Sequence, residues 1–147
     1  MRKWIVGALA LSLSWSASAQ ELPQPSPTAT INQRVGLTDF TVVYSRPSAK
    51  GRTIFGDLVP FGQVWRTGAN ACTILSSTSD FKMGGEEIKA GKYALFTIPG
   101  EGSWTIIVST QTNLWGNSGY DAANDVARFV VNTTESDFGE TCGIDFD

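Results

Sequence analysis

The chain of 147 residues contains no histidine and only two cysteines, Cys72 and Cys142. Without histidine there can be no Ser-His-Asp triad, no Cys-His pair and no histidine-based zinc or copper site. Two cysteines 70 positions apart cannot supply a thiolate metal cluster either. Residues 113–125 are rich in side-chain oxygens, yet they lack a D-x-D-x-D-G calcium loop, so we interpret them as a plain polar loop. We therefore expect no metal and no cofactor.

Long hydrophobic runs are also missing. The longest, residues 4–13, has about ten residues, whereas a membrane-spanning helix needs about 18 or more. It follows Arg2 and Lys3 and precedes an Ala-Ser-Ala cleavage site at residues 17–19, which is the pattern of a secretory signal. We expect residues 1–19 to be a signal peptide and the protein to be exported, periplasmic or secreted, with no membrane span.

Positive charge is scarce once the signal is removed. The remaining 128 residues carry nine basic and fourteen acidic side chains, a net charge of −5, so nucleic acid is not an expected partner. The charge is unevenly spread, because residues 34–66 hold five of the nine bases and residues 135–147 hold five acids and no base. Two solvated surface faces account for this distribution without a charged ligand.

Alternation of apolar and polar residues dominates, and no window shows a sustained helical period. Gly84-Gly85 favours a two-residue hairpin that pairs residues 81–83 with residues 86–88. The nearly continuous apolar segment of residues 92–98 is typical of a strand covered on both faces, so we expect it at the centre of the sheet. Residues 121–126 are compatible with one helical turn. The remaining predicted strands are residues 37–45, 71–77, 104–110 and 126–132.

These short strands and regular turns predict an all-β fold, an antiparallel β-sandwich or jelly-roll-like single domain. Residues 20–28 contain three prolines and little to bury, so we interpret them as a flexible leader before a domain of residues 29–147. The two cysteines leave two alternatives. Export permits a Cys72–Cys142 disulfide, which would close a loop of about 71 residues and contribute about 4 kcal/mol. Otherwise both are small buried apolar residues.

Residues 44–70 form the most distinctive segment, which is too long and irregular for an ordinary hairpin connection. It holds three of the six arginines, together with several aromatic residues, four glycines and two prolines, as a structured binding loop does. Arginine grips carboxylate or phosphate, and Trp65 offers a face for a sugar ring. In an extended backbone Trp65 and Arg66 point in opposite directions. The candidate ligand-binding residues here are Tyr44, Arg46, Arg52, Trp65, Arg66 and Asn70.

Three functional interpretations remain open for this segment. In the first, it binds a small anionic or carbohydrate ligand, or a protein partner. In the second, the protein is a carbohydrate-active hydrolase or lyase that uses two carboxylates, or Tyr44 with Arg46 or Arg52. In the third, the arginines bind carbonyls and acids of their own domain and the segment is purely structural. No catalytic residue is assigned, and the candidate carboxylates are Asp39, Asp57, Asp80, Glu86, Glu87, Asp121 and Asp125.

Four motifs resemble a known family: YSRPSAKGRTIFGDLVPFGQVWRTGANA, AGKYALFTIPG, WTII and NLWG. The chain is similar, from about residue 29 onward, to the exported bacterial proteins grouped as domain of unknown function family 2911. The resemblance implies a secreted or periplasmic β-sandwich-type domain with no established activity and no catalytic residues to transfer. The family pattern adds Tyr93 to the candidate ligand-binding residues.

Two departures from the family pattern concern the end of the chain and the cysteines. Family members continue past Asp147, so this chain is expected to be short at its C-terminus and to lack one or more last strands. Ile144 and Phe146 alternate with acids, which predicts a final strand with an exposed edge, open to a protein partner. The pattern does not require Cys72 or Cys142, and this favours their pairing.

Overall fold

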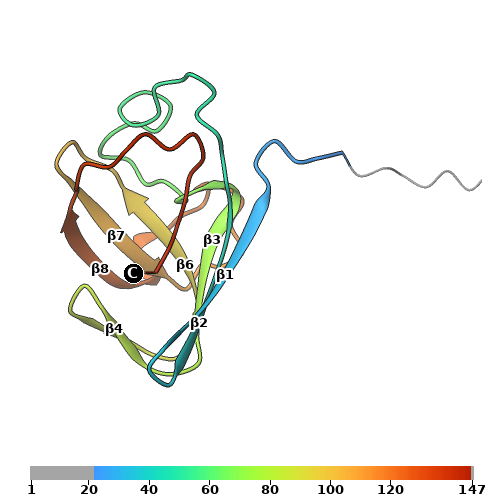
Figure 1. Ribbon diagram of the computed structural model, residues 1–147. Coiled ribbons are helices and arrows are strands. Elements are labelled where there is room, and N and C mark those ends of the chain that lie inside the picture. The colour runs from blue at the N-terminus through green and yellow to red at the C-terminus, as the bar shows by residue number, and fades with distance from the viewer. Residues whose placement is uncertain (1–21, 147) are drawn as a thin grey trace, which may run out of the picture.

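A computed structural model describes residues 22–146, so the predicted signal peptide of residues 1–19 lies outside the described residues. The fold is antiparallel β throughout, with one short 3-10 turn, η1 (Ala122–Asn124), as Figure 1 shows. No helix in the described part is long and apolar enough to cross a membrane. The all-β antiparallel prediction is confirmed. The strands are β1 (Thr28–Val35), β2 (Thr38–Ser45), β3 (Ala69–Ser77), β4 (Phe81–Met83), β5 (Glu86–Ile88), β6 (Gly91–Ile98), β7 (Ser103–Ser109) and β8 (Asp125–Asn132).

Six strands form one sheet in the order β1-β2-β3-β6-β7-β8, and β4 and β5 form a separate two-stranded sheet. Strand β6 lies at the centre, as predicted, and its Ala94 and Phe96 are fully buried. The β4–β5 hairpin is also as predicted, because Gly84 and Gly85 adopt φ angles of 59° and 88° that side chains other than glycine rarely tolerate.

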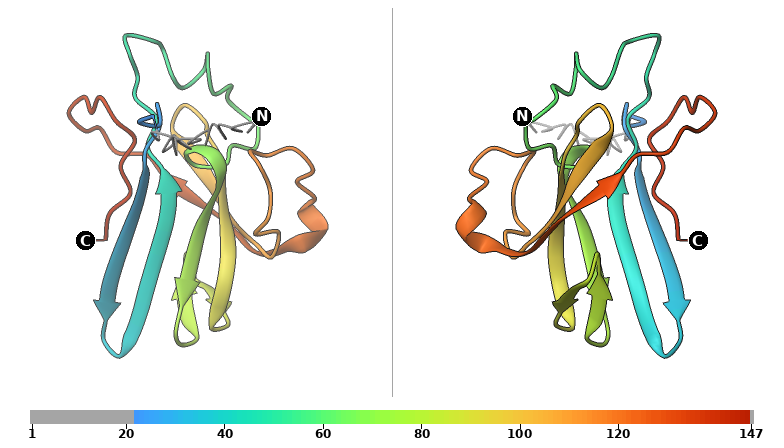
Figure 2. Two further views of the ribbon diagram at one scale, coloured as in Figure 1. Left: turned by 90° about the vertical axis from the view of Figure 1, so that its right-hand side faces the viewer. Right: turned by 90° about the vertical axis from the view of Figure 1, so that its left-hand side faces the viewer.

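The two faces of the large sheet are covered by different segments, because successive side chains of a strand point to opposite faces. One face, here the loop face, centres on Cys72, Phe96 and Ile107 and is covered by residues of the 111–124 loop, including Leu114 and Tyr120. The other, here the strap face, is covered by the β4–β5 hairpin and by residues 133–146, here called the strap. In the side views of Figure 2 the strap and the 111–124 loop lie on opposite sides of the molecule.

The strand predicted at residues 142–147 is wrong for the described residues 142–146, which lie outside any strand. Ile144 and Phe146 pack instead against the buried cluster of Val42, Tyr44 and Leu75 on the strap face. Their alternation therefore reflects packing onto a face and not pairing at an edge. Strands β1 and β8 form the edges of the sheet. Residues 142–146 therefore offer no edge strand with which a protein partner could pair.

Strand β1 was not among the predicted strands. Most of its side chains are exposed and polar, and only Ala29 and Ile31 contact the core, so it carries little apolar alternation. It also begins at Thr28, inside the predicted leader, and the Pro27 carbonyl accepts a 2.9 Å hydrogen bond from the Arg46 N–H. The end of the predicted leader is therefore part of the folded domain.

Candidate functional site

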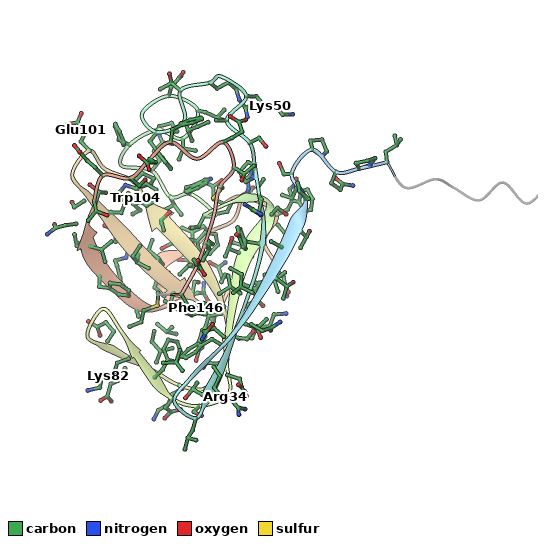
Figure 3. All side chains as sticks on the ribbon, viewed as in Figure 1. Arg34, Lys50, Lys82, Glu101, Trp104 and Phe146 are labelled. Atoms are coloured by element: carbon green, nitrogen blue, oxygen red, sulfur yellow. The ribbon has the colours of Figure 1, made fainter. Side chains whose placement is uncertain are left out.

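The connection between β2 and β3, residues 46–68, crosses one end of the large sheet, the upper end in Figure 1. The strap passes beside it and forms the opposite wall of a cleft of about 1050 Å³. In Figure 3, Lys50 and Trp104 lie at this end of the molecule, whereas Arg34 and Lys82 lie at the other. The cleft is lined by four of the seven predicted site residues, Arg52, Trp65, Arg66 and Asn70.

The first half of the segment is tied to the strap by hydrogen bonds. The Arg46 guanidinium donates from Nε to the Cys142 carbonyl at 3.1 Å and from Nη2 to Thr141 Oγ1 at 2.9 Å. Backbone hydrogen bonds add to it, since the Ala49 N–H donates to the Glu140 carbonyl at 2.8 Å. Arg46 therefore fastens two segments that lie almost a hundred residues apart and does not itself line the cleft.

Arg52 is bound within its own turn. Its Nε donates to the Ala49 carbonyl at 2.9 Å and its Nη2 to the Ser48 carbonyl at 2.8 Å. The guanidinium borders the cleft, but two of its donor groups are already used by the backbone. The contacts of Arg46 and Arg52 therefore fit the third interpretation, in which the arginines bind groups of their own domain.

Three aromatic side chains gather on the cleft wall. Phe55 lies 4.7 Å from Trp104 and 5.7 Å from Trp65 between ring centroids, and the two tryptophans are 6.2 Å apart, all edge to face. The Trp65 indole N–H donates to the Gly68 carbonyl at 3.1 Å, which fixes the ring. Trp104 comes from β7 and was missed by the sequence analysis, because alternation places it on a strand without showing what lies beside it.

The turn that leads into β3 is strained. Thr67 and Asn70 have φ angles of 57° and 59°, in the left-handed region that a β-branched residue such as threonine rarely adopts. Between them Gly68 has no room for a side chain, because a Cβ there would lie 2.9 Å from the Ser45 carbonyl oxygen. The Thr67 hydroxyl lies 3.1 Å from that of Thr97 and helps to hold the turn. Strain of this kind clusters at binding and catalytic sites.

Arg66 differs from the other two arginines of the segment. Within the described residues its guanidinium has no hydrogen bond and no ion pair, and its Nε is buried without a partner. Its side chain extends toward Gly116, because Nη1 lies 3.5 Å from the position that a Cβ of Gly116 would take. Trp65 packs instead toward Phe55 and Trp104. The two neighbours thus point in different directions, as their alternation predicts. Burial lowers the pKa of Arg66 below its usual value.

Tyr44 and Tyr93, two predicted site residues, lie outside the cleft. Tyr44 is only 4% exposed, and its hydroxyl accepts a 3.0 Å hydrogen bond from the Ile144 N–H of the strap. Tyr93 packs on the cluster of Ile88 and Leu95 beside the β4–β5 hairpin, and its hydroxyl donates to the Lys89 carbonyl at 3.0 Å. Both tyrosine hydroxyls therefore make hydrogen bonds within the domain, away from the cleft.

The cysteines are not bridged. Both are free thiols, and they lie on opposite faces of the sheet. Cys72 is buried in the loop-face core, 3.6 Å from the Thr112 carbonyl oxygen, whereas Cys142 lies in the strap, next to Arg46. Burial raises the pKa of the Cys142 thiol, and the nearby Arg46 acts against this. The second alternative, a small buried residue, therefore describes Cys72, whereas Cys142 is unlinked but only half-buried.

The candidate carboxylates of the enzyme hypothesis are scattered, and none lines the cleft. Asp39 pairs with Arg34 at 2.7 Å, and the hydrogen bond from Arg34 lowers the pKa of its carboxyl group. Asp80 and Glu87 border a separate hollow of about 460 Å³ on the β4–β5 hairpin, where each is paired with a lysine. The acids that do line the cleft, Asp137 and Glu140, were missed. The acid-rich end of the sequence was their only signal.

A tyrosine and an arginine do meet in the structure, but not at the predicted positions. Arg128 donates to the Tyr120 hydroxyl at 2.8 Å and to Asp125 at 3.0 Å, while the Tyr120 hydroxyl donates to Asp125 at 2.7 Å. Burial, together with Asp125, raises the pKa of Tyr120 to about 12, which suits a neutral anchor better than a base. This network ties the 111–124 loop to β8.

Among the described residues, no group of three or more histidine, cysteine, aspartate or glutamate side chains is placed to hold a metal ion. In the 113–125 loop, Asp121 uses its carboxylate to accept a 2.9 Å hydrogen bond from the Ala123 N–H at the start of η1. The oxygen-rich loop therefore uses one of its carboxylates for a local turn.

Comparison with known proteins identifies one family. The sequence profile described as Protein of unknown function (DUF2911) matches residues 26–147, which include the whole sheet, the cleft-forming segment and the strap. No curated protein matches the chain, and no solved structure does. The chain therefore belongs to the DUF2911 family of proteins of unknown function.

Proposed function

We propose that this protein is an exported carbohydrate-binding module, that the cleft between the segment and the strap is its binding site, and that it has no catalytic activity. The observation that carries the proposal is the group of three aromatic rings, Phe55, Trp65 and Trp104, on the cleft wall. Export is supported by the signal-like sequence of residues 1–19.

Partly exposed aromatic rings suit a sugar because its C–H faces are apolar and its edges carry hydroxyls. Phe55 is 40% exposed, although three rings in contact could have buried one another. The hydrogen bond from Trp65 to Gly68 holds that ring in place before any ligand arrives, which reduces the entropy lost on binding. Polar lining residues, among them Thr53, Ser136 and Asp137, can bond to hydroxyl groups.

The proposal of binding without catalysis rests on the carboxylates. Glycoside hydrolysis needs two acids that flank one bond, and the candidates from the sequence lie outside the cleft. Of the two acids that line it, Glu140 already accepts a 2.9 Å hydrogen bond from the Lys50 N–H through one carboxylate oxygen. That contact gives Glu140 a structural task in joining the strap to the segment.

The test is a glycan array of neutral and acidic oligosaccharides probed with the intact protein and with Trp65→Ala and Trp104→Ala. Losing one stacked ring should weaken binding about tenfold or more, equivalent to about 1.4 kcal/mol. Trp115→Ala is the matched control, because Trp115 is 73% exposed and does not line the cleft. Absence of glycan binding by the intact protein, or an equal loss in the control, would contradict the proposal.

The glycans that bind should then be incubated with the protein and analysed for products by mass spectrometry. We expect every glycan to be recovered intact. Product release that disappears in Asp137→Asn or Glu140→Gln, with both variants still folded by circular dichroism, would show that the cleft is an active site instead.

A further inference from the structure

We propose that Arg66 forms an anion subsite at the border of the cleft, so that the ligand is an acidic carbohydrate carrying a carboxylate or a sulfate. This inference rests on the proposed carbohydrate-binding function and names the class of sugar. It follows from what Arg66 lacks, from its partial burial and from its place at the cleft.

Arg66 is the arginine without a partner among those the structure describes. The other four each use at least two donor groups: Arg34 on Asp39, Arg46 on the strap, Arg52 on its own turn, and Arg128 on Asp125 and Tyr120. All five belong to one fold with a surplus of acids, so a counter-ion for Arg66 would have been easy to supply. None of the described acids reaches it.

Burial makes the missing partner costly. The Nε atom is shielded from solvent and unbonded, and burial lowers the pKa of the guanidinium, so part of its hydration is lost without replacement. A desolvated charge with no counter-ion destabilises a protein unless another group supplies the opposite charge. An anionic group of a ligand would supply it and would regain the lost interactions on binding.

The backbone around Arg66 holds it in place on both sides. Its carbonyl accepts from the Thr73 N–H at 3.4 Å, and the carbonyl of Val64, two residues earlier, accepts from Asn117 Nδ2 at 2.6 Å. Across from it, the Gly116 N–H donates to the Asn70 carbonyl at 2.9 Å. The backbone that carries Arg66 is therefore fixed by β3 and by the 111–124 loop.

A glycine packs beside the guanidinium. Gly116 has φ of 76°, a left-handed angle that favours glycine, and a Cβ there would lie 3.5 Å from Arg66 Nη1, an ordinary van der Waals contact. Arginine presents a planar fork that two oxygens of a carboxylate or sulfate match. Because Trp65 and Arg66 both border the cleft but diverge, a ligand that touches both extends over more than one sugar unit.

The experiment measures affinity by isothermal titration calorimetry for three trisaccharide probes: a trigalacturonate, its methyl ester, and a sulfated galactose trimer. Each probe is titrated into the intact protein and into Arg66→Gln, Arg66→Lys and Arg34→Gln, the last being a control at the other end of the molecule. We expect a charged probe to bind about tenfold or more tightly than the ester, as for a charge-assisted hydrogen-bonded pair. Arg66→Gln should remove this preference, Arg66→Lys should restore part of it, and Arg34→Gln should keep it.

The outcomes separate the two proposals. Equal affinity for trigalacturonate, its ester and the sulfated probe, with no effect of Arg66→Gln, overturns the anion subsite and leaves the carbohydrate proposal standing. No binding of any probe, together with a blank glycan array, overturns both. Inorganic sulfate, titrated in the same way, overturns the carbohydrate proposal and supports the subsite if it binds as tightly as the sulfated trimer and loses this binding in Arg66→Gln. A preference for sulfate over carboxylate, lost in Arg66→Gln, supports the subsite and identifies its anion.

Discussion

The two halves of the segment between β2 and β3 share a composition but differ in their contacts. In the first half, Arg46 and Arg52 use their guanidinium groups on carbonyls and a hydroxyl of the domain itself. In the second half, Arg66 has no such partner within the described residues. Left-handed backbone angles at residues other than glycine occur in both halves, at Lys50 in the first and at Thr67 in the second. The guanidinium groups of the first half have hydrogen-bond partners, whereas that of the second half has none among the described residues. A region that supports the fold differs from a binding region in this way.

The largest expected effect that tests this comparison is in the first half. Arg46→Ala removes two charge-assisted hydrogen bonds and leaves the partly buried Cys142 carbonyl without its donor, so the free energy of unfolding should fall by about 3 kcal/mol. Urea denaturation measures it. The control is Arg34→Ala, which breaks an exposed ion pair with Asp39 and should change the free energy of unfolding very little. Equal losses would remove the supporting role from the first half.

A somewhat smaller effect is expected at the strained turn of the second half. Gly68→Ala places a Cβ 2.9 Å from the Ser45 carbonyl oxygen. The backbone shift that relieves this contact should lower the free energy of unfolding by about 2 kcal/mol. It should also weaken glycan binding, because the Gly68 carbonyl holds the Trp65 ring. Gly102→Ala is the control, since a Cβ there meets nothing within 4 Å. The melting temperatures of both variants test this prediction. A Gly68→Ala protein as stable as the control would show that the turn can relax around the added Cβ.

Arg52→Ala should cost less than Arg46→Ala, about 1 kcal/mol in the free energy of unfolding. Both acceptors of Arg52 lie within four residues of it, so its hydrogen bonds stabilise one exposed turn and join no distant segments. Urea denaturation in parallel with Arg46→Ala gives the ranking. A larger loss for Arg52→Ala would mean that the turn, and not the strap, supports the cleft.

The smallest expected effect is that of a reducing agent. Because both cysteines are free and lie on opposite faces of the sheet, dithiothreitol should leave the melting temperature unchanged to within about 1 °C. The unfolded protein should react with two equivalents of a thiol reagent without prior reduction. A drop in melting temperature on reduction would reveal a disulfide and would tie the strap to the core under the second half of the segment.

Much of the fold could be predicted from the sequence, because strand alternation and glycine turns are local signals. Gly84-Gly85 placed the β4–β5 hairpin, and the apolar run of residues 92–98 placed the central strand β6. Strand β1 was missed since its apolar alternation is limited to a few residues such as Ala29 and Ile31. In the strap the alternation of Ile144 and Phe146 was visible, but it has the same form for an edge strand and for a segment lying across a face.

The candidate site was predictable only in part. The composition of the segment marked Arg52, Trp65, Arg66 and Asn70, which do line the cleft. What each arginine does depends on partners far away in the chain, such as Cys142 for Arg46, and composition carries no information on those contacts. Trp104 was missed for the same reason, because it reaches the cleft from a strand that follows the segment by almost forty residues.

The strap has a consequence for the order of events during folding. One wall of the cleft comes from residues 47–70 and the other from residues 136–144, so the site does not exist until the last part of the chain has docked. Contacts of such long sequence separation require a large loop to close, and they form late unless other contacts bring them together. The stoichiometry of ligand binding would then serve as a count of completely folded molecules, since a chain with an intact sheet and an undocked strap has half a binding site.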